Sequence, residues 1–559
     1  MLNYKRYQRV PVINYPEREW PNKEIEKAPV WCSVDLRDGN QALIDPMVVE
    51  EKIELFQMLI KLGFKEIEIG FPAASQIEFD FLRQLVERKM IPDDVRVQVL
   101  TQCREELIDR TFESIQGIKQ AIVHIYNSTS TLQRKVVFGM NQEEIKAIAV
   151  AGTKMVKERA AKFPGKIILE YSPESFTGTE LDFSLDICTA VQDAWGPTKE
   201  NPIIINLPAT VEMTTPNVYA DQIEWMNKHF KDRESIILSI HPHNDRGTGI
   251  AATELGMLAG ADRVEGTLFG NGERTGNIDV LNIAYNMFSQ GINPELHIEH
   301  IGEIIEVYER CCKMPIHDRH PYAGKLVFTA FSGSHQDAIN KGVKAMRESN
   351  AQIWQVPYLP IDPSDIGREY EPIVRINSQS GKGGVAFVMD TYFGFKLPKG
   401  MHKEFAAVIQ KISEVQGEVS PDQIMQSFRE NYIEKKEPLH FRKLKVEDKS
   451  DTVDTEFDTH IILTYTLYGK ENSFQAVGNG PIDAVQRGIK ENLGINVKVL
   501  DYEEHALQGG SNAQAAAYIH LLNAEDGSVT YGVGVSSNIT RASVRAIFSA
   551  INRLGLMNK

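Results

Sequence analysis

The chain has 559 residues, of which 42% are hydrophobic and 25% charged, and its formal net charge is −15. These proportions are ordinary for a globular protein, and the length predicts more than one domain. The chain is acidic and has no Lys/Arg-rich run, so nucleic acid is not an expected partner, and no apolar stretch is long enough to cross a bilayer. Five cysteines, scattered apart from the adjacent Cys311 and Cys312, and no signal-peptide core at the N-terminus favour a reduced, cytoplasmic protein.

From Val30 to about Gly291, apolar strand-like runs alternate with amphipathic, helix-like stretches. The runs interpreted as strands are Val30–Leu36, Glu66–Gly70, Val95–Leu100, Ala121–Tyr126, Ile167–Glu170, Ile203–Leu207, Ile236–Ile240 and Arg263–Leu268. The helix-like stretches include Val49–Leu62, Gln76–Arg88, Phe183–Trp195 and Gly247–Ala259. This alternation predicts an α/β fold, a (β/α)8 TIM barrel. An open doubly wound sheet is the alternative, but the chain lacks the glycine-rich phosphate turn expected there.

Polar residues collect where these runs end, and in a (β/α)8 barrel the chemistry takes place at that face. The polar positions are Asp35–Gln41, Glu68, His124, Glu170–Glu174, Leu207–Thr210, His241 to Asp245, and Gly270–Asn277. Among them, His241 and His243 are two residues apart, so an extended backbone places both imidazoles on one face. With a third ligand they could bind a divalent metal; otherwise they are solvated histidines at a strand end.

The rest of the chain has a different pattern. We expect an N-terminal extension over residues 1–29, the barrel over 30–292, helical linker subdomains over 293–438 and a C-terminal α+β domain over 439–559. In the linker, Gln379–Ala386 is interpreted as a turn. In the tail, β-like and helical runs occur twice, which predicts a βββα repeat. The runs are His460–Tyr468, Pro481–Asn492, Val497–Leu507, Ala515–Leu522, Thr530–Val535 and Ala542–Leu554.

Arg37-Asp38-Gly39, together with His241-x-His243, resembles a motif of the metal-dependent TIM-barrel lyases and Claisen condensing enzymes related to pyruvate carboxyltransferases. Three further segments, Ser33–Gln41, Tyr171–Gly178 and Gly270–Asn277, narrow the resemblance to the 2-isopropylmalate synthases in their longer form. The likeness runs through nearly the whole chain. One departure is Asn40, where many relatives carry Glu, so the resemblance implies no acidic role at this position.

The resemblance implies condensation of acetyl-CoA with 3-methyl-2-oxobutanoate and hydrolysis of the thioester. A 2-oxo acid can chelate a metal through two oxygens, and the metal then polarises the ketone. The implied ligands are Asp38, His241 and His243, with Asn277 as a fourth. We expect Mg²⁺, with Zn²⁺ or Mn²⁺ as alternatives, because a mixed nitrogen and oxygen set accepts all three.

Arg37 is the expected electrophilic partner of the ketone oxygen, on which negative charge grows in the transition state. A structural salt bridge, for instance to Glu68, is the alternative for Arg37. Thr210 is expected to donate to the substrate carboxylate and Glu174 to position substrate or water, unless both only cap the following helices. The set expected to bind substrate is Glu68, Thr210, Gly270, Gly272 and Gly276.

His335 and Tyr358 match residues that reach into the neighbouring subunit's active site, so the resemblance implies a homodimer. A histidine suits proton removal or water activation near neutral pH; a polar residue at a helix N-terminus is the alternative for His335. In this resemblance the tail senses leucine as an inhibitor, with Gly478, Gly480 and Tyr502 in the matching motifs. A dimerisation domain without a ligand is the alternative for the tail.

Other functions stay open on the sequence. Homocitrate and citramalate synthases share the metal site and differ in the 2-oxo acid that they accept. An aldolase-type lyase would run the same bond chemistry backwards. A sensor or scaffold built on an inactive barrel is a different class, which the intact set of Arg37, Asp38, His241 and His243 disfavours.

Overall fold

The computed structural model describes residues 12–329, 333–370, 382–416, 419–448, 459–507 and 513–557. The chain divides into two compact units. The first holds the residues up to Phe328 together with Ile361–Glu369, and the second holds Thr329–Pro360 and the chain from Tyr370 onward.

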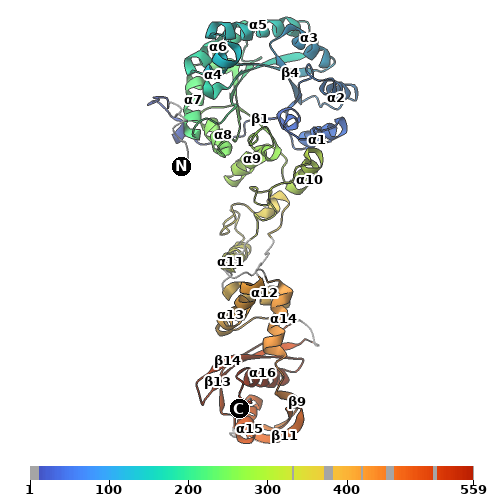
Figure 1. Ribbon diagram of the computed structural model, residues 1–559, viewed down its shortest axis with the longest axis vertical. Coiled ribbons are helices and arrows are strands. Elements are labelled where there is room, and N and C mark those ends of the chain that lie inside the picture. The colour runs from blue at the N-terminus through green and yellow to red at the C-terminus, as the bar shows by residue number, and fades with distance from the viewer. Residues whose placement is uncertain are drawn as a thin grey trace. The chain divides into compact units, whose positions relative to one another are not determined.

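The first unit is built on a closed barrel of eight parallel strands, which confirms the predicted fold class (Figure 1). The barrel closes where β1 pairs with β8, with Val30 opposite Arg263. The strands are β1 (Val30–Ser33), β2 (Glu66–Gly70), β3 (Arg96–Gln102), β4 (Gln120–Ser128), β5 (Lys166–Glu174), β6 (Ile203–Ala209), β7 (Ile236–Pro242) and β8 (Arg263–Gly266).

Helices follow the strands and surround the barrel in Figure 1. They are α1 (Val49–Lys61), α2 (Gln76–Glu87), α3 (Glu105–Ser114), the short α4 (Thr131–Gln133), α5 (Gln142–Ala160), α6 (Leu181–Trp195), α7 (Pro216–His229), α8 (Gly249–Leu258), α9 (Val280–Ser289) and α10 (Ile301–Cys312). Local sequence starts α5, because Asn141 and Glu144 form a reciprocal capping box. None of the described helices has the length and apolarity needed to cross a membrane.

At the end that carries the site, most predicted runs end within two residues of the observed strand, and the first and fifth runs differ by more. The run predicted over Val30–Leu36 ends as a strand at Ser33, because Asp35–Gly39 forms a π-helix, η3. Asp35 is buried there and accepts the N–H of Leu268 at 3.0 Å, which ties η3 to the end of β8. Burial raises the pKa of Asp35 to about 7. The fifth strand extends beyond its apolar run, to Glu174.

The barrel interior combines an apolar layer with buried charge. Ile122, Ile168 and Ile204 pack together in the apolar layer. Arg263 is fully buried, and its guanidinium donates to Glu66 at 2.5 Å and to Glu265 at 2.7 Å. Removing one partner of a buried ion pair typically costs about 3–5 kcal/mol, so this cluster should make the interior intolerant of single substitutions.

Helices dominate the chain after the barrel. They are α11 (Gly333–Ser349), the 3₁₀ helix η8 (Pro363–Ile366), α12 (Lys382–Phe393), α13 (Lys399–Gln416), α14 (Pro421–Phe428) and the π-helix η9 (Arg429–Ile433). The turn predicted over Gln379–Ala386 is wrong for residues 382–386, which begin α12, and its first three residues lie outside the described chain. The helix forms because Val385, Val388 and Met389 pack into an apolar core.

The tail contains the predicted βββα unit twice. The first sheet has the order β11-β10-β9 and the second β12-β13-β14. The elements are β9 (Leu439–Asp448), β10 (Thr459–Leu467), β11 (Lys470–Gly478), α15 (Pro481–Leu493), β12 (Val497–Ala506), β13 (Ala515–Asn523), β14 (Val529–Ser536) and α16 (Ile539–Arg553). Residues of both βββα repeats pack into one hydrophobic core.

Candidate functional site

Three side chains meet at the barrel mouth as a candidate metal centre. Asp38 lies in η3, His241 is the next-to-last residue of β7, and His243 follows that strand. His241 Nε2 lies 3.2 Å and His243 Nε2 3.4 Å from Asp38 Oδ2. All three side chains are buried, and their candidate ligand atoms lie within 4.8 Å of one another. The spacing of two along β7 therefore brings both imidazoles to one point, as the sequence predicted.

Hydrogen bonds behind the two imidazoles fix their orientation. His241 Nδ1 lies 2.6 Å from Glu265 Oε2, and His243 Nδ1 lies 3.3 Å from the carbonyl oxygen of Ala209. With the proton on Nδ1 in each ring, both Nε2 atoms have a lone pair directed towards Asp38. A carboxylate or carbonyl behind the imidazole is the usual support of a metal-bound histidine.

Asn277 lies beside this triad and offers a further oxygen. It forms an isolated backbone bridge with His243. Its amide nitrogen donates to the carbonyl of Asn271 at 3.2 Å, whereas its Oδ1 is buried and has no hydrogen-bond partner. A buried acceptor without a partner is costly. One carboxylate, two imidazoles and one amide oxygen fit a divalent cation, and Asn277 stays a predicted ligand.

Arg37 lies next to the triad and is held by two carboxylates. Its Nε donates to Glu68, and its Nη1 lies 3.2 Å from Asp38 Oδ1. Burial disfavours the charged form of Asp38, but Arg37, His241 and His243 outweigh burial and hold the pKa of Asp38 well below its ordinary value. Against the same burial, Arg37 and His124 lower the pKa of Glu68 to about 2.

The salt bridge to Glu68, considered as the alternative role of Arg37, is therefore present. Arg37 nevertheless also lies at the candidate site. Arg37 lines the pocket at the barrel mouth, whereas the fully buried Glu68 does not. Glu68 also accepts from Gln98 at 2.5 Å. The structure thus gives Glu68 a positioning role behind Arg37, and direct contact of Glu68 with substrate stays a prediction.

The pocket in front of the triad has a volume of about 220 Å³. Its lining residues are Arg37, Asp38, Gln41, Phe71, Leu100, His124, Tyr126, Ser172, Glu174, Asn206, Pro208, Thr210, His241, His243, Glu273 and Arg274. The sequence interpretation gave no role to the apolar members of this wall. Their only sequence signal is a position at or just after a strand end, where alternation decides which side chain faces inward.

Glu174 and Thr210 both line this pocket. Glu174 accepts from Ser128 Oγ, and Thr210 Oγ1 accepts the backbone N–H of Ser175 at 2.9 Å. The alternative of helix capping is wrong for both residues, because α6 and α7 begin after Glu180 and Thr215. The hydroxyl proton of Thr210 is still available to an acceptor in the pocket, so its contact with a substrate carboxylate stays a prediction.

The three glycines of the Gly270–Asn277 segment have structural reasons for their identity. Gly270 and Gly276 have φ of +76° and +98°. A Cβ at Gly276 would lie 2.0 Å from Gly270 O, and one at Gly272 would lie 2.2 Å from Asn277 Nδ2. The absent side chains therefore allow the loop to fold tightly around Asn277. Approach of a thioester to these glycines stays a prediction.

His335 and Tyr358 belong to the second compact unit. Their ring centroids lie 4.1 Å apart at an interplanar angle of 30°, although 23 positions separate them in the chain. Tyr358 has 63% of its surface exposed and a left-handed backbone with φ of 66°. The two predicted catalytic residues thus form one exposed pair. His335 lies near the start of α11, so its alternative as a polar residue of a helix N-terminus also stays open.

The three residues predicted to bind leucine lie in both halves of the tail. Gly478 ends β11 and Gly480 precedes α15, whereas Tyr502 lies in β12. A Cβ at Gly478 would lie 2.4 Å from the Ala484 nitrogen, but one at Gly480 would meet nothing within 4 Å. The Tyr502 hydroxyl lies 3.1 Å from Ser543 Oγ on α16. Close packing therefore explains why position 478 is a glycine, whereas Gly480 has free space beside it.

Comparison with known families divides the chain into three matched segments. Residues 28–307 match the HMGL-like family, residues 325–390 the post-catalytic domain-like family of alpha-isopropylmalate synthase, and residues 418–555 the LeuA allosteric (dimerisation) domain.

Curated relatives match over nearly the whole chain. A 2-isopropylmalate synthase of Clostridium acetobutylicum is 55% identical over 98% of this chain and 99% of its own length. Proteins of the same name from Acetoanaerobium sticklandii and Rhodospirillum rubrum are 53% and 52% identical, over 99% and 98% of this chain and 97% and 98% of their own lengths.

Proposed function

We propose that this chain, which belongs to the 2-isopropylmalate synthase family, condenses acetyl-CoA with 3-methyl-2-oxobutanoate and water to give 2-isopropylmalate and CoA. The observation that carries the proposal is the buried set of Asp38, His241 and His243 at the mouth of a barrel pocket, beside Arg37. It is an acyltransferase in which a divalent metal assists a Claisen-type condensation, the first committed step towards leucine.

Asp38, His241, His243 and Asn277 would hold the metal, which we propose to be Mg²⁺, with Zn²⁺ and Mn²⁺ as alternatives. When bound, a divalent cation supplies Lewis-acid polarisation of the ketone of a chelated 2-oxo acid. The low pKa of Asp38 keeps its carboxylate ionised and ready for that cation.

Arg37 would stabilise the oxygen of the ketone as negative charge develops on it. Its guanidinium is fixed by Glu68 on one side and Asp38 on the other, so it needs little reorganisation during the reaction. Thr210 would donate its hydroxyl to the substrate carboxylate. Glu174, which also lines the pocket, would position substrate or the water that hydrolyses the thioester.

The pocket wall supports a branched apolar substrate over 2-oxoglutarate. Phe71, Leu100 and Pro208 line it and offer apolar surface to an isopropyl group. A homocitrate synthase would have to bind a second, distal carboxylate. Of the two arginines that line the pocket, Arg37 pairs with Glu68 and Arg274 with Asp245. Pyruvate, the substrate of a citramalate synthase, would leave the apolar surface uncovered.

We further propose a cytoplasmic homodimer in which His335 and Tyr358 complete the site of the partner chain. The exposed His335–Tyr358 pair supports this arrangement, because a basic imidazole beside a phenol suits removal of a proton from the acetyl methyl group. The match of the tail to an allosteric (dimerisation) domain supports leucine as an inhibitor that acts there. Gly478, Gly480 and Tyr502 are the proposed residues of that leucine site.

The test is a thiol-release assay with acetyl-CoA and four 2-oxo acids: 3-methyl-2-oxobutanoate, pyruvate, 2-oxoglutarate and glyoxylate. We expect the highest kcat/KM with 3-methyl-2-oxobutanoate, and release of CoA only when a divalent cation is present. The Asp38→Asn variant is the matched control, since it preserves shape and removes the anionic ligand. A higher kcat/KM with 2-oxoglutarate or pyruvate would assign the chain to a different reaction.

A further inference from the structure

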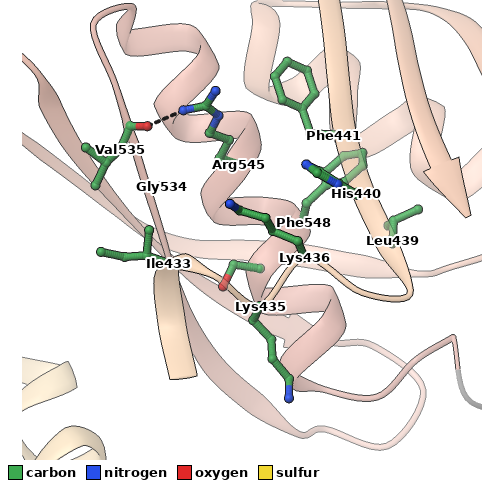
Figure 2. A pocket seen from close by; sticks show the side chains of 11 residues that line it. Ile433, Lys435, Lys436, Leu439, His440, Phe441, Gly534, Val535, Arg545 and Phe548 are labelled. Atoms are coloured by element: carbon green, nitrogen blue, oxygen red, sulfur yellow. Dashed lines mark hydrogen bonds between the residues drawn. The ribbon is translucent and has the colours of Figure 1, made fainter. Parts of the chain in front are cut away.

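A second pocket lies within the tail, where β14 and α16 meet the segment that leads into β9 (Figure 2). Its volume is about 170 Å³. The lining residues are Ile433, Lys435, Lys436, Leu439, His440, Phe441, Gly534, Val535, Arg545, Phe548 and Ser549. None of them belongs to the barrel site or to the residues proposed for leucine.

The lining of this pocket is strongly cationic. It includes Lys435, Lys436 and Arg545, together with His440, and it includes no carboxylate. Within the described part of the chain, none of the three permanent cations forms an ion pair. In Figure 2 the side chains of Lys436, His440 and Arg545 lie together, whereas Lys435 extends away from Arg545.

The electrostatic effect is visible at His440. Partial burial, Arg442 and Lys436 together lower the pKa of its imidazole, against an opposing effect of Glu437. Glu437 is near, but it is not among the residues that line the pocket. An uncompensated cluster of this kind raises the local concentration of anions.

Hydrogen bonds from α16 hold the walls in place. Asn552 Nδ2 donates to the carbonyls of Lys435 and Leu439, each at 2.8 Å, and Ser549 donates to the carbonyl of Tyr432. Arg545 Nη1 donates to the carbonyl of Val535 at 2.5 Å, which leaves the rest of its guanidinium for another acceptor. The pocket is therefore preformed in the described structure.

We propose that this pocket binds a small dianion, either a phosphate group or a dicarboxylate. Its volume of about 170 Å³ suits a small molecule. The positive charges of Lys436 and Arg545, with Lys435 in the same lining, favour a ligand with two negative charges. Leucine is a poor fit, because its ammonium group would face the same cations. The site thus goes beyond the proposed function, and it is distinct from the proposed leucine site.

A dianion bound here would contact three segments at once: Lys436 before β9, His440 within β9 and Arg545 on α16. It would thereby strengthen the attachment of the segment that follows η9 to the α16 helix. Ligand binding to the folded state alone raises apparent stability, so an increase in Tm is an expected second readout.

The test is isothermal titration calorimetry on the full-length chain in a zwitterionic buffer at constant ionic strength. Inorganic phosphate and malate are the two probes, and sodium chloride is the screening control. We expect saturable binding of at least one probe and at least about tenfold weaker binding to Lys436→Gln, because a charge-assisted hydrogen bond is lost. Arg541→Gln, which changes an exposed arginine on the same helix outside the pocket, should bind like the wild type.

Binding of phosphate alone or of malate alone would support the proposal and identify the ligand class. Arg545→Lys is the second variant, since it keeps the charge but loses the planar fork, and should also weaken binding. Its Tm should be recorded, because Arg545 also bonds to Val535. Absence of saturable binding to both probes, or equal affinity of the wild type and Lys436→Gln, would overturn the proposal.

Discussion

Glu265 Oε2 lies 2.6 Å from His241 Nδ1, on the side of the imidazole opposite Asp38. Glu265 is fully buried and also accepts a hydrogen bond from Asn206 at 3.2 Å, so contacts other than His241 help to fix its carboxylate. A residue of β8 therefore sets the orientation of a predicted metal ligand on β7, and this relationship gives the first prediction.

Glu265→Gln should weaken metal binding by about 10–100-fold, the usual effect of losing a carboxylate behind a metal-bound histidine. Added metal should restore part of the activity. The measurement is a metal titration followed by calorimetry, with Tm recorded because Glu265 also pairs with Arg263. Asp245→Asn, which removes the partner of the pocket-lining Arg274, is the matched control and should keep its metal affinity. Unchanged affinity in Glu265→Gln would remove this role.

Arg37→Lys should lower kcat at least about tenfold while the metal content stays unchanged. Lysine keeps the positive charge, but it cannot donate in two fixed directions towards Glu68 and Asp38 at once. The experiment combines steady-state kinetics with metal analysis of the same sample. A normal kcat would mean that the arginine is needed only for structure.

Metal binding should weaken as the pH falls below about 9. Burial favours neutral His241, but hydrogen bonds to Asp38 and Glu265 outweigh burial and raise its pKa to about 9. A metal needs the neutral imidazole, so binding should release a proton and lose up to about tenfold in affinity per pH unit below that value.

The stability of the metal-free protein should depend on pH in the opposite direction. A raised pKa means that the charged imidazole stabilises the fold fully below its ordinary pKa of 6.5, and that this contribution is lost as the pH rises through about 9. Metal titrations between pH 6.5 and 9.5, in buffers of different ionisation enthalpy, give both the affinity and the protons released. A flat affinity across this range would contradict the assigned proton on His241.

The sequence predicted the positions of the metal residues better than their surroundings. The alternation along β7 sufficed to place His241 and His243 on one face, and the strand order placed Asp38 at the same end of the barrel. The supporting role of Glu265 could not be read from the chain, since it depends on which side chains of neighbouring strands meet inside the barrel. The interpretation of the Arg263–Leu268 run treated it simply as an apolar strand.

In the tail, too, one element could not be predicted from the sequence because it depends on contacts between distant residues. The repeat was predicted from apolar runs, yet β11 was not singled out, because most of its first residues are exposed and polar. Its strand character comes from pairing with β10 over nine positions. Partners distant in sequence decide such an element, whereas α15 and α16 follow from helical periodicity in the chain.

Heterodimers provide a test of the His335–Tyr358 pair. Mixing an Arg37→Ala chain with a His335→Ala chain should restore activity at one of the two active sites in each heterodimer. That site would combine the intact Arg37 of one chain with the intact His335 of the other. Both homodimers of single variants should be inactive and serve as controls. Affinity tags of two kinds would verify the heterodimer before assay. No recovery in verified heterodimers would favour sites that are complete within one chain.

Gly480→Asp should abolish inhibition by leucine and spare the condensation. Gly480 has an extended backbone with φ of −172°, and a Cβ there meets no atom within 4 Å, so the substitution should not disturb folding. Aspartate is also a favourable residue before a helix, and it would cap α15. The new carboxylate would occupy space at the proposed leucine site and repel the carboxylate of leucine.

The expected result is a kcat close to that of the wild type with little or no response to leucine. An effector in the tail need shift a conformational equilibrium by only ~1–3 kcal/mol to change turnover severalfold or more, so in the wild type added 3-methyl-2-oxobutanoate should not relieve the inhibition. Ser420→Asp, which places the same charge at the start of α14 outside the repeat, should leave inhibition unchanged. Full leucine inhibition of Gly480→Asp, or competition between leucine and 3-methyl-2-oxobutanoate in the wild type, would place the effector away from the α15 start.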